Sequence, residues 1–231
     1  MIQVKRHIVI PDFMQIRVMA PQAVAAAIPW WLSGGISAAN CYCAYQPKGA
    51  ASLAASYSNL NDPGTNNAGV GVAPTWDAVN GWIFNGSTQY LTTTFVPAND
   101  QSQMMVVQFS NVTGDGYICG VYNATGIAFS IGPSRTGQRW YRNGETSNPG
   151  ANVLSGNMCV AGAQGYLNGA ADGGWMGPWR APTLGTVWIG CMNQSGVVFL
   201  PLAAYIQALA IYDTTLTAPQ VAAVSAAMAL L

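Results

Sequence analysis

The sequence predicts an all-β protein, an antiparallel β-sandwich or jelly roll, with an extended N-terminal arm and a short C-terminal helix. Asn-Gly dipeptides, a strong signal for β-hairpins, occur four times among the 231 residues. Short apolar or alternating runs lie between these turns, as expected for strands packed in a sheet. Many short strands with frequent turns are typical of sandwiches and jelly rolls.

Charged residues make up only 7% of the chain, against about a quarter in an average domain. Such a chain must cover its surface with uncharged polar residues or bury it against partner subunits, so we expect a homo-oligomer. Eight basic and eight acidic side chains cancel. We therefore expect no nucleic-acid partner and no membrane partner, and no apolar stretch approaches the ~20 residues of a membrane span.

Residues 1–40 differ from the rest and are interpreted as an arm that anchors the protein. They contain Lys5, Arg6 and Arg17, which we predict to be the anchoring residues. Two uses of the arm stay open: it adds a strand to its own domain, or it docks on a neighbouring molecule. Residues 41–231 form the predicted β-sandwich domain.

The domain opens with two cysteines, Cys41 and Cys43, whose spacing places both on one side of a strand. The chain has five cysteines in all, an odd number without a CxxC pair. This pattern predicts neither a zinc site nor a disulfide framework. We interpret the cysteines as reduced thiols of a protein folded inside a cell.

Each Asn-Gly dipeptide is predicted to form a hairpin turn, because both residues tolerate a positive φ. They are Asn80-Gly81, Asn85-Gly86, Asn143-Gly144 and Asn168-Gly169. Three apolar runs, at 104–109, 185–190 and 205–212, are predicted strands. The first is apolar at every position except Gln108, as expected in the middle of a packed sheet.

A short helix is predicted after the last strand. Thr217 and Gln220 have the spacing of a capping box, and Leu216 and Val221 flank the cap as a hydrophobic staple. The following residues are rich in alanine and too apolar for an exposed helix. We expect this helix to cover an apolar edge of the sandwich.

Three segments together resemble the laminin G-like, concanavalin A-like jelly-roll domains. They are GWIFNGSTQYLTTTF (81–95), GYLNGAADGG (165–174) and YIQALAIYDTTLTAPQVAAV (205–224). The resemblance implies a sandwich whose last strand runs into a short helix. A further segment, CYCAYQPKGAASLAASYSNLNDPG (41–64), resembles structural proteins of tailed bacteriophages.

These resemblances imply a non-catalytic bacteriophage virion protein, either a capsid decoration or head fibre or a tail-associated protein. Its partners would be other virion proteins and a host-surface glycan, and its location the virion. The alternative is a secreted or surface carbohydrate-binding or adhesion module of a cell. That alternative predicts oxidised cysteines and a cleaved N-terminus.

The residues do not favour an enzyme. Glycoside hydrolases of this fold need two carboxylates, yet Glu145 is the single glutamate and follows a predicted hairpin turn. His7, the single histidine, lies in the arm, which excludes a catalytic triad within the domain. We therefore predict no catalytic residues and no cofactor. The scattered aspartates do not support a calcium site, which needs about six oxygens.

Two segments are candidate glycan-binding loops. Trp175, Trp179 and Arg180 lie in a Gly/Pro-rich loop, where the indoles could stack on sugar rings. Arg139 and Tyr141 are predicted to share one face of a hairpin and to extend this site. The alternatives are that both indoles fold down over the sandwich rim and that the hairpin is merely an exposed polar one.

Overall fold

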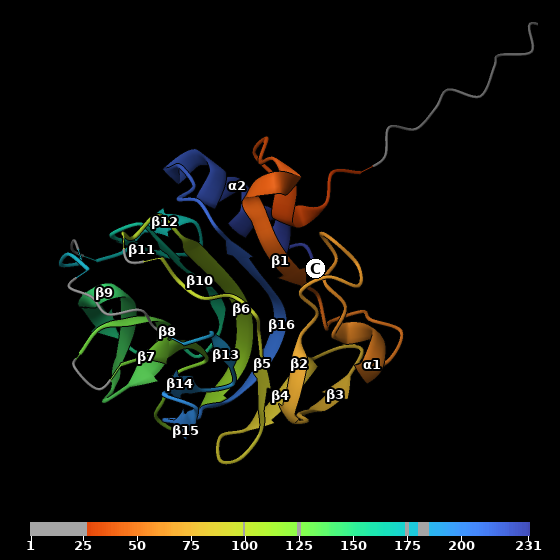
Figure 1. The fold of residues 1–231 in the computed structure, drawn as a ribbon, viewed down its shortest axis with the longest axis horizontal. Coiled ribbons are helices and arrows are strands. Elements are labelled where there is room, and N and C mark those ends of the chain that lie inside the picture. The colour runs from red at the N-terminus through yellow and green to blue at the C-terminus, as the bar shows by residue number, and fades with distance from the viewer. Residues whose placement is uncertain (1–26, 99, 124–125, 174–175, 180–184) are drawn as a thin grey trace, which may run out of the picture.

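The structure, a computed structural model, describes residues 27–98, 100–123, 126–173, 176–179 and 185–231. Two β-sheets pack face to face, and one helix with a short 3₁₀ turn covers the outer face of one sheet (Figure 1). This arrangement confirms the predicted β-sandwich with a short C-terminal helix.

Sheet A has eight strands within the described residues. In spatial order, it contains β12 (Ala170–Ala171), β11 (Gln164–Leu167), β10 (Gly156–Ala161), β6 (Met104–Thr113), β16 (Ala203–Tyr212), β4 (Gly81–Asn85) and β3 (Thr75–Asp77). The eighth strand, β1 (Cys41–Tyr45), pairs with the second half of β16, beyond β4. All these pairings are antiparallel.

Sheet B also has eight strands in the described part of the chain. In spatial order, it contains β15 (Val197–Phe199), β14 (Met192–Gln194), β7 (Cys119–Tyr122), β13 (Trp188–Ile189), β5 (Tyr90–Thr92) and β2 (Gly69–Val72). Two long strands, β8 (Ala128–Arg135) and β9 (Gln138–Ala151), extend the sheet from β7. The pairing of β14 with β7 is parallel, and the other pairings are antiparallel.

The apolar run at 104–109 becomes β6, in the middle of sheet A as predicted. Its side chains alternate between two cores: Met105 and Val107 face the interior between the sheets, whereas Met104 and Val106 face the helix layer. The run is apolar at every position except Gln108 because the strand is buried on both faces.

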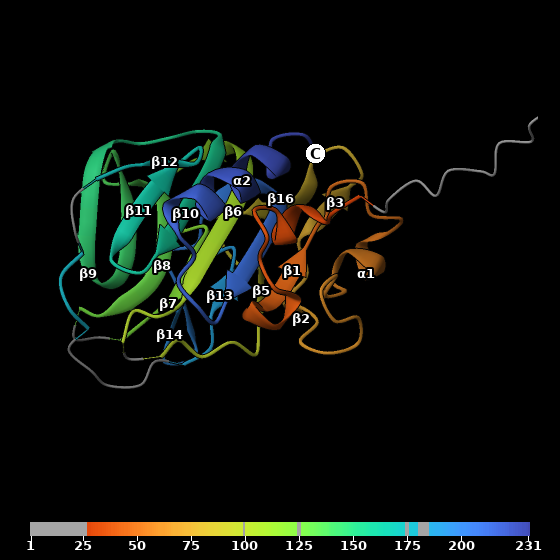
Figure 2. The same cartoon turned by 90° about the horizontal axis from the view of Figure 1, so that it is seen from above.

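Helix α2 (Ala218–Met228) lies over the outer face of sheet A (Figure 2). Val221, Val224 and Met228 are fully buried there, and each buried apolar side chain of this size contributes about 1.5–3 kcal/mol. The predicted capping box is present: the Thr217 side chain accepts from the Gln220 backbone N–H, and Gln220 Oε1 accepts the Thr217 N–H at 3.0 Å. The helix thus covers a sheet face rather than an edge of the sandwich.

The described part of the predicted arm belongs to this same outer layer. Residues 30–32 form η1 (Trp30–Leu32), residues 38–40 form η2 (Ala38–Asn40), and Trp30 and Ile36 are buried beside α2. The Tyr212 hydroxyl in β16 donates to the Trp31 carbonyl at 2.9 Å. Residues 1–26, which include Lys5, Arg6, His7 and Arg17, lie outside the described residues, so the anchoring role of the arm stays a prediction.

Two of the four predicted Asn-Gly hairpins are confirmed. Asn168-Gly169 joins β11 to β12, and both residues have a positive φ, 51° and 82°, as a tight two-residue turn requires. Asn80-Gly81 lies in the β3–β4 hairpin. Gly81, at φ 79°, packs against the Ile206 carbonyl where an added Cβ would overlap it.

The prediction for Asn85-Gly86 was wrong, because this dipeptide begins a crossing from sheet A to sheet B. The Asn85 Oδ1 atom accepts the N–H groups of Ser87 and Thr88 at 2.9 and 3.0 Å. This side-chain turn leads the chain from β4 in one sheet to β5 in the other.

The prediction for Asn143-Gly144 was also wrong, since both residues lie within β9, and the β8–β9 hairpin turns at Thr136-Gly137 instead. The Asn143 side chain is buried, accepting from Gln103 Nε2 at 2.6 Å and donating to the Gly162 carbonyl at 2.9 Å. Gly144 has φ 103° where the backbone of Gly177 approaches it. The dipeptide thus serves a buried polar network.

Cys41 and Cys43 face opposite sides of sheet A, contrary to the prediction. A β-bulge between them shifts the register against β16. Cys41 therefore packs under the helix layer, and Cys43 packs in the core between the sheets. All five cysteines are buried and free, in agreement with the predicted reduced thiols.

Candidate functional site

The loop predicted to bind glycans is described only in part. Trp175 and Arg180 lie outside the described residues. Trp179 is half-buried and packs against the main core, and its Nε1 atom is buried with no hydrogen-bond partner within the described chain. Its indole therefore folds down onto the sandwich.

Arg139 and Tyr141 lie on β9 and meet a single carboxylate, that of Asp172. Arg139 binds it through two hydrogen bonds, from Nε at 2.6 Å and from Nη2 at 2.7 Å. The Tyr141 hydroxyl donates to the same carboxylate at 2.6 Å. Because Tyr141 is fully buried in the main core, its ring offers no face to a sugar, and its predicted glycan contact is corrected to a structural role.

The pKa shifts in this cluster favour an ionised Asp172 paired with a charged Arg139. Burial raises the pKa of Tyr141, and its hydrogen bond to Asp172 raises that pKa further. Burial alone would raise the pKa of Asp172, but hydrogen bonds from Arg139 and Tyr141 and the charge of Arg139 outweigh it and hold that pKa below its usual value. The cluster is thus a partly buried ion pair with its partners already in place.

The remaining candidates for acid–base or nucleophilic chemistry are poorly placed for it. Glu145 lies in the interior of β9 with its carboxylate against Gly177, not at a hairpin tip. Burial raises the pKa of Cys43 and of Cys191 to about 12, which keeps both thiols protonated. Among the described residues, no group of three or more His, Cys, Asp or Glu side chains could hold a metal ion.

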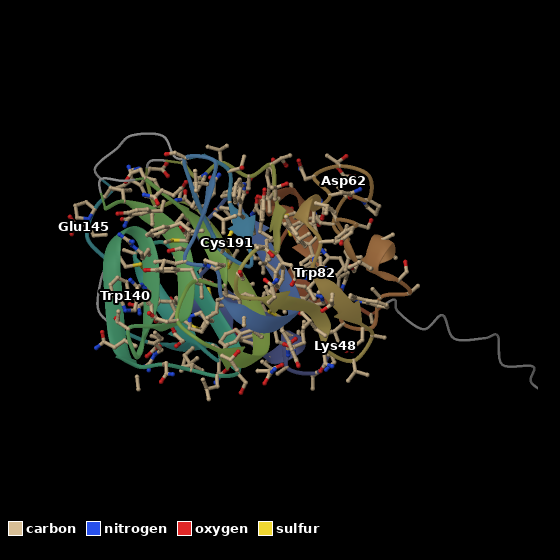
Figure 3. The ribbon with its side chains drawn as sticks, turned by 90° about the horizontal axis from the view of Figure 1, so that it is seen from below. Lys48, Asp62, Trp82, Trp140, Glu145 and Cys191 are labelled. Atoms are coloured by element: carbon tan, nitrogen blue, oxygen red, sulfur yellow. The ribbon has the colours of Figure 1, made fainter. Side chains whose placement is uncertain are left out.

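A pocket that the sequence did not reveal lies between the end of β1 and helix α1 (Leu53–Ser56), and we call it the β1–α1 pocket. It has a volume of about 300 Å³. Its lining combines polar side chains with small and apolar ones: Gln46, Lys48, Ser56, Ser58, Gly49, Ala50, Ala55 and Leu60. Figure 3 shows Lys48 toward the end of the molecule that carries α1, with Trp140 and Glu145 at the opposite end.

Three tryptophans from other parts of the chain fix the walls of this pocket. Trp30 Nε1 donates to Gln46 Oε1 at 3.0 Å, and Trp76 Nε1 donates to the Pro47 carbonyl at 2.8 Å. Trp82 Nε1 donates to the Ser56 hydroxyl at 2.7 Å. Trp30 and Trp82 therefore each hold a lining residue, and Trp76 holds Pro47, which stands between the lining residues Gln46 and Lys48, so the pocket is formed in advance of any ligand.

One signal in the sequence could have pointed to the pocket. Lys48 is the single charged residue between Arg17 and Asp62. It stands in a Pro-Lys-Gly segment directly after a strand, and loops that follow strands are common positions for binding residues. The walls of the pocket leave no local signal, because they come from segments far apart in sequence.

The helices of the described chain do not combine the length and the apolar character needed to cross a membrane. No protein-family model matches the sequence, and no curated protein is similar to it.

Solved structures share the fold at low identity. The sialidase of Trypanosoma rangeli matches with a TM-score of 0.58 and 14% identity, covering 80% of this chain and 32% of that protein. The same sialidase as a covalent intermediate with 2,3-difluorosialic acid matches with a TM-score of 0.57 and 15% identity, covering 87% and 35%. This chain thus spans about a third of the sialidase's length.

A third structure is matched over nearly its whole length. It is domain 4 of AbnA, a GH43 extracellular arabinanase from Geobacillus stearothermophilus, in complex with arabinotriose. The TM-score is 0.51 with 12% identity, covering 80% of this chain and 98% of that domain. What these proteins share with this chain is the β-sandwich fold.

Proposed function

We propose that this chain is a non-catalytic carbohydrate-binding module whose sugar site is the β1–α1 pocket. The observation that carries the proposal is the pocket itself, which has a mixed polar and apolar lining and walls that are held in place by three indole hydrogen bonds. Its volume lies at the lower end of the range for small-molecule sites, about 300–1,000 Å³. A site of that size suits one or two sugar rings.

The lining of the pocket matches the two kinds of surface on a sugar ring. Sugar hydroxyls need hydrogen-bonding groups, which Gln46 and Ser58 supply. The C–H faces of the ring need apolar contacts, which Ala50 and Leu60 supply. In this respect the pocket is better suited to a sugar than to a purely apolar ligand.

The fold comparison supports the same class of ligand. The arabinanase domain with this fold was solved with arabinotriose bound. A non-catalytic role is supported by the protonated thiols and by the position of Glu145 in the interior of β9. Sugar binding at the pocket is therefore the function that the geometry supports best.

A glycan array followed by calorimetry on the best binder tests this proposal. Ala55→Leu places a larger side chain at the exposed wall of the pocket and should weaken binding by about tenfold or more. Ala54→Leu changes the neighbouring residue of α1, which does not line the pocket, and should leave the affinity unchanged. Equal affinities of the two variants would overturn the pocket as the site.

The virion role stays a second proposal, and one observation favours it. All five cysteines are free and buried, which suits assembly in a reducing compartment better than secretion. Locating the protein in intact bacteriophage particles by electron microscopy tests this role. Finding it instead on a cell surface, with a processed N-terminus, would support the adhesion-module alternative.

A further inference from the structure

Lys48 differs from the other basic residues that the structure describes. Arg135 pairs with Asp115 at 2.6 Å, and Arg139 pairs with Asp172 at 2.6 Å. Arg142 lies over the Tyr122 ring, 5.2 Å from its centre. Within the described part of the chain, no carboxylate oxygen lies within 4.0 Å of the Lys48 ammonium group. Lys48 instead lines the β1–α1 pocket.

The carboxylate on the strand pair beside Lys48 is already engaged. The β3–β4 turn packs on the Lys48 segment through the Gly49 N–H, which donates to the Ala78 carbonyl at 2.8 Å. In this turn, Asp77 accepts from the Asn80 side chain at 2.8 Å and from the backbone N–H groups of Val79 and Asn80 at 2.8 and 2.7 Å. Asp77 therefore holds its own turn together and leaves the ammonium group of Lys48 without a counter-charge.

The pocket also offers more donors than acceptors. Gln46 Oε1 is occupied by Trp30, while Gln46 Nε2 donates to the Lys48 carbonyl at 3.3 Å and keeps its second N–H. The Ser56 hydroxyl is fully used, since it donates to the Leu53 carbonyl at 2.6 Å and accepts from Trp82. The groups left for a ligand are the ammonium of Lys48, one amide N–H of Gln46 and the Ser58 hydroxyl.

A positive site with surplus donors selects a ligand with a negative charge and many acceptors. We infer that the β1–α1 pocket is selective for sugars that carry a carboxylate, and that the Lys48 ammonium group pairs with that carboxylate. Gln46 and Ser58 then bind hydroxyls of the same ring. A carboxylate brings one negative charge to the one ammonium group, and the pair is partly shielded from water because Lys48 is half-buried.

This inference rests on the proposed sugar site, and its test separates the two. The probes are a soluble polyuronate and the same polymer after chemical reduction of its carboxylates to alcohols. The wild-type protein should bind the polyuronate about tenfold more tightly than the reduced polymer, because one charge-assisted hydrogen bond is lost. This preference should shrink from about 0.05 M to about 0.5 M NaCl.

Two variants that each remove one positive charge are compared, Lys48→Gln as the test and Arg135→Gln as the control. Lys48→Gln should reduce polyuronate affinity about tenfold, to the level of the reduced polymer, and should leave affinity for the reduced polymer within about twofold. Arg135→Gln removes the same charge at an exposed ion pair, where the side chains are 26% and 47% exposed, and should leave both affinities unchanged. Circular dichroism of each variant confirms that it is folded.

The outcomes separate clearly. Equal binding of both polymers by the wild-type protein would keep the sugar site and overturn carboxylate selectivity. An equal loss in Lys48→Gln and Arg135→Gln would assign the preference to net charge rather than to Lys48, and would also overturn the inference. A sulfated form of the reduced polymer that bound as tightly as the polyuronate would exclude the carboxylate as the recognised group. Binding of no polymer would overturn the proposed function together with the inference.

Discussion

At the scale of single residues, Asp172 is held in its charged form by Arg139 and Tyr141. Its depressed pKa predicts an acid-sensitive contribution to stability. A carboxylate whose pKa is lowered in the folded state stabilises the protein above its unfolded pKa, about 4, and loses this effect as the pH falls through the folded value. Asp172→Asn should lower the free energy of unfolding by about 2 kcal/mol at neutral pH and should reduce the loss of stability below pH ~4.

Urea unfolding followed between neutral pH and about pH 2.5 measures both effects. Asp115→Asn is the matched control, because it breaks the exposed pair with Arg135, and exposed pairs contribute about 0–1 kcal/mol. If Asp172→Asn retained the acid dependence of the wild-type protein, the ion pair would not be its source.

The sequence could not place these residues correctly, although it singled out two of them. Strand periodicity does put Arg139 and Tyr141 on the same face of β9, but it does not predict whether that face is buried or exposed. Tyr141 is buried by packing in the core between the sheets, and the partner of both residues, Asp172, comes from the segment after β12. The β1–α1 pocket escaped prediction for a similar reason, since Trp30, Trp76 and Trp82 reach it from three different elements.

At the scale of elements, the strands and the helix with the strongest local patterns were predicted well. The runs at 104–109 and 205–212 lie in β6 and β16, where burial on both faces selects apolar side chains at every position except Gln108 and Gln207. The Asn143-Gly144 turn failed because a positive φ serves a close backbone approach as well as it serves a hairpin. An Asn-Gly dipeptide therefore indicates a positive φ, and the surrounding structure decides whether that φ forms a hairpin turn or allows a close backbone approach.

The cap of α2 gives a prediction at this scale. Thr217→Ala should lower the free energy of unfolding by about 1 kcal/mol, because the N-cap side chain is lost. Gln220→Ala removes the acceptor of both Thr217 hydrogen bonds, so the double variant should cost less than the two single variants added together. Thermal unfolding of the four proteins measures this coupling. Fully additive losses, or no change in Thr217→Ala, would contradict the capping box.

At the scale of the whole molecule, three layers share two cores. Sheet B and sheet A enclose the larger core, and the outer face of sheet A carries the smaller one beneath α2 and the 30–36 segment. The small side chains of Ala208 and Ala210 on β16 face this outer layer, where bulkier ones would hold the helix away. The segment at 30–36 completes this outer core and also holds Gln46 in the pocket through Trp30.

Two truncations therefore should behave differently. Removing residues 1–26 should leave the unfolding midpoint unchanged, because the members of both cores in the described part of the chain all lie beyond position 26. Removing residues 1–40 also takes away Trp30 and Ile36, which are each 6% exposed, and should cost about 4 kcal/mol, since loss of a buried tryptophan alone typically costs 3–5 kcal/mol. The longer truncation should also weaken sugar binding, because Gln46 loses its indole partner. Equal stability of the two truncated proteins in urea would show that the 30–36 segment is no part of the outer core.

If the virion proposal holds, the shorter truncation should fold yet fail to join the particle, and its full incorporation would remove the anchoring role from residues 1–26.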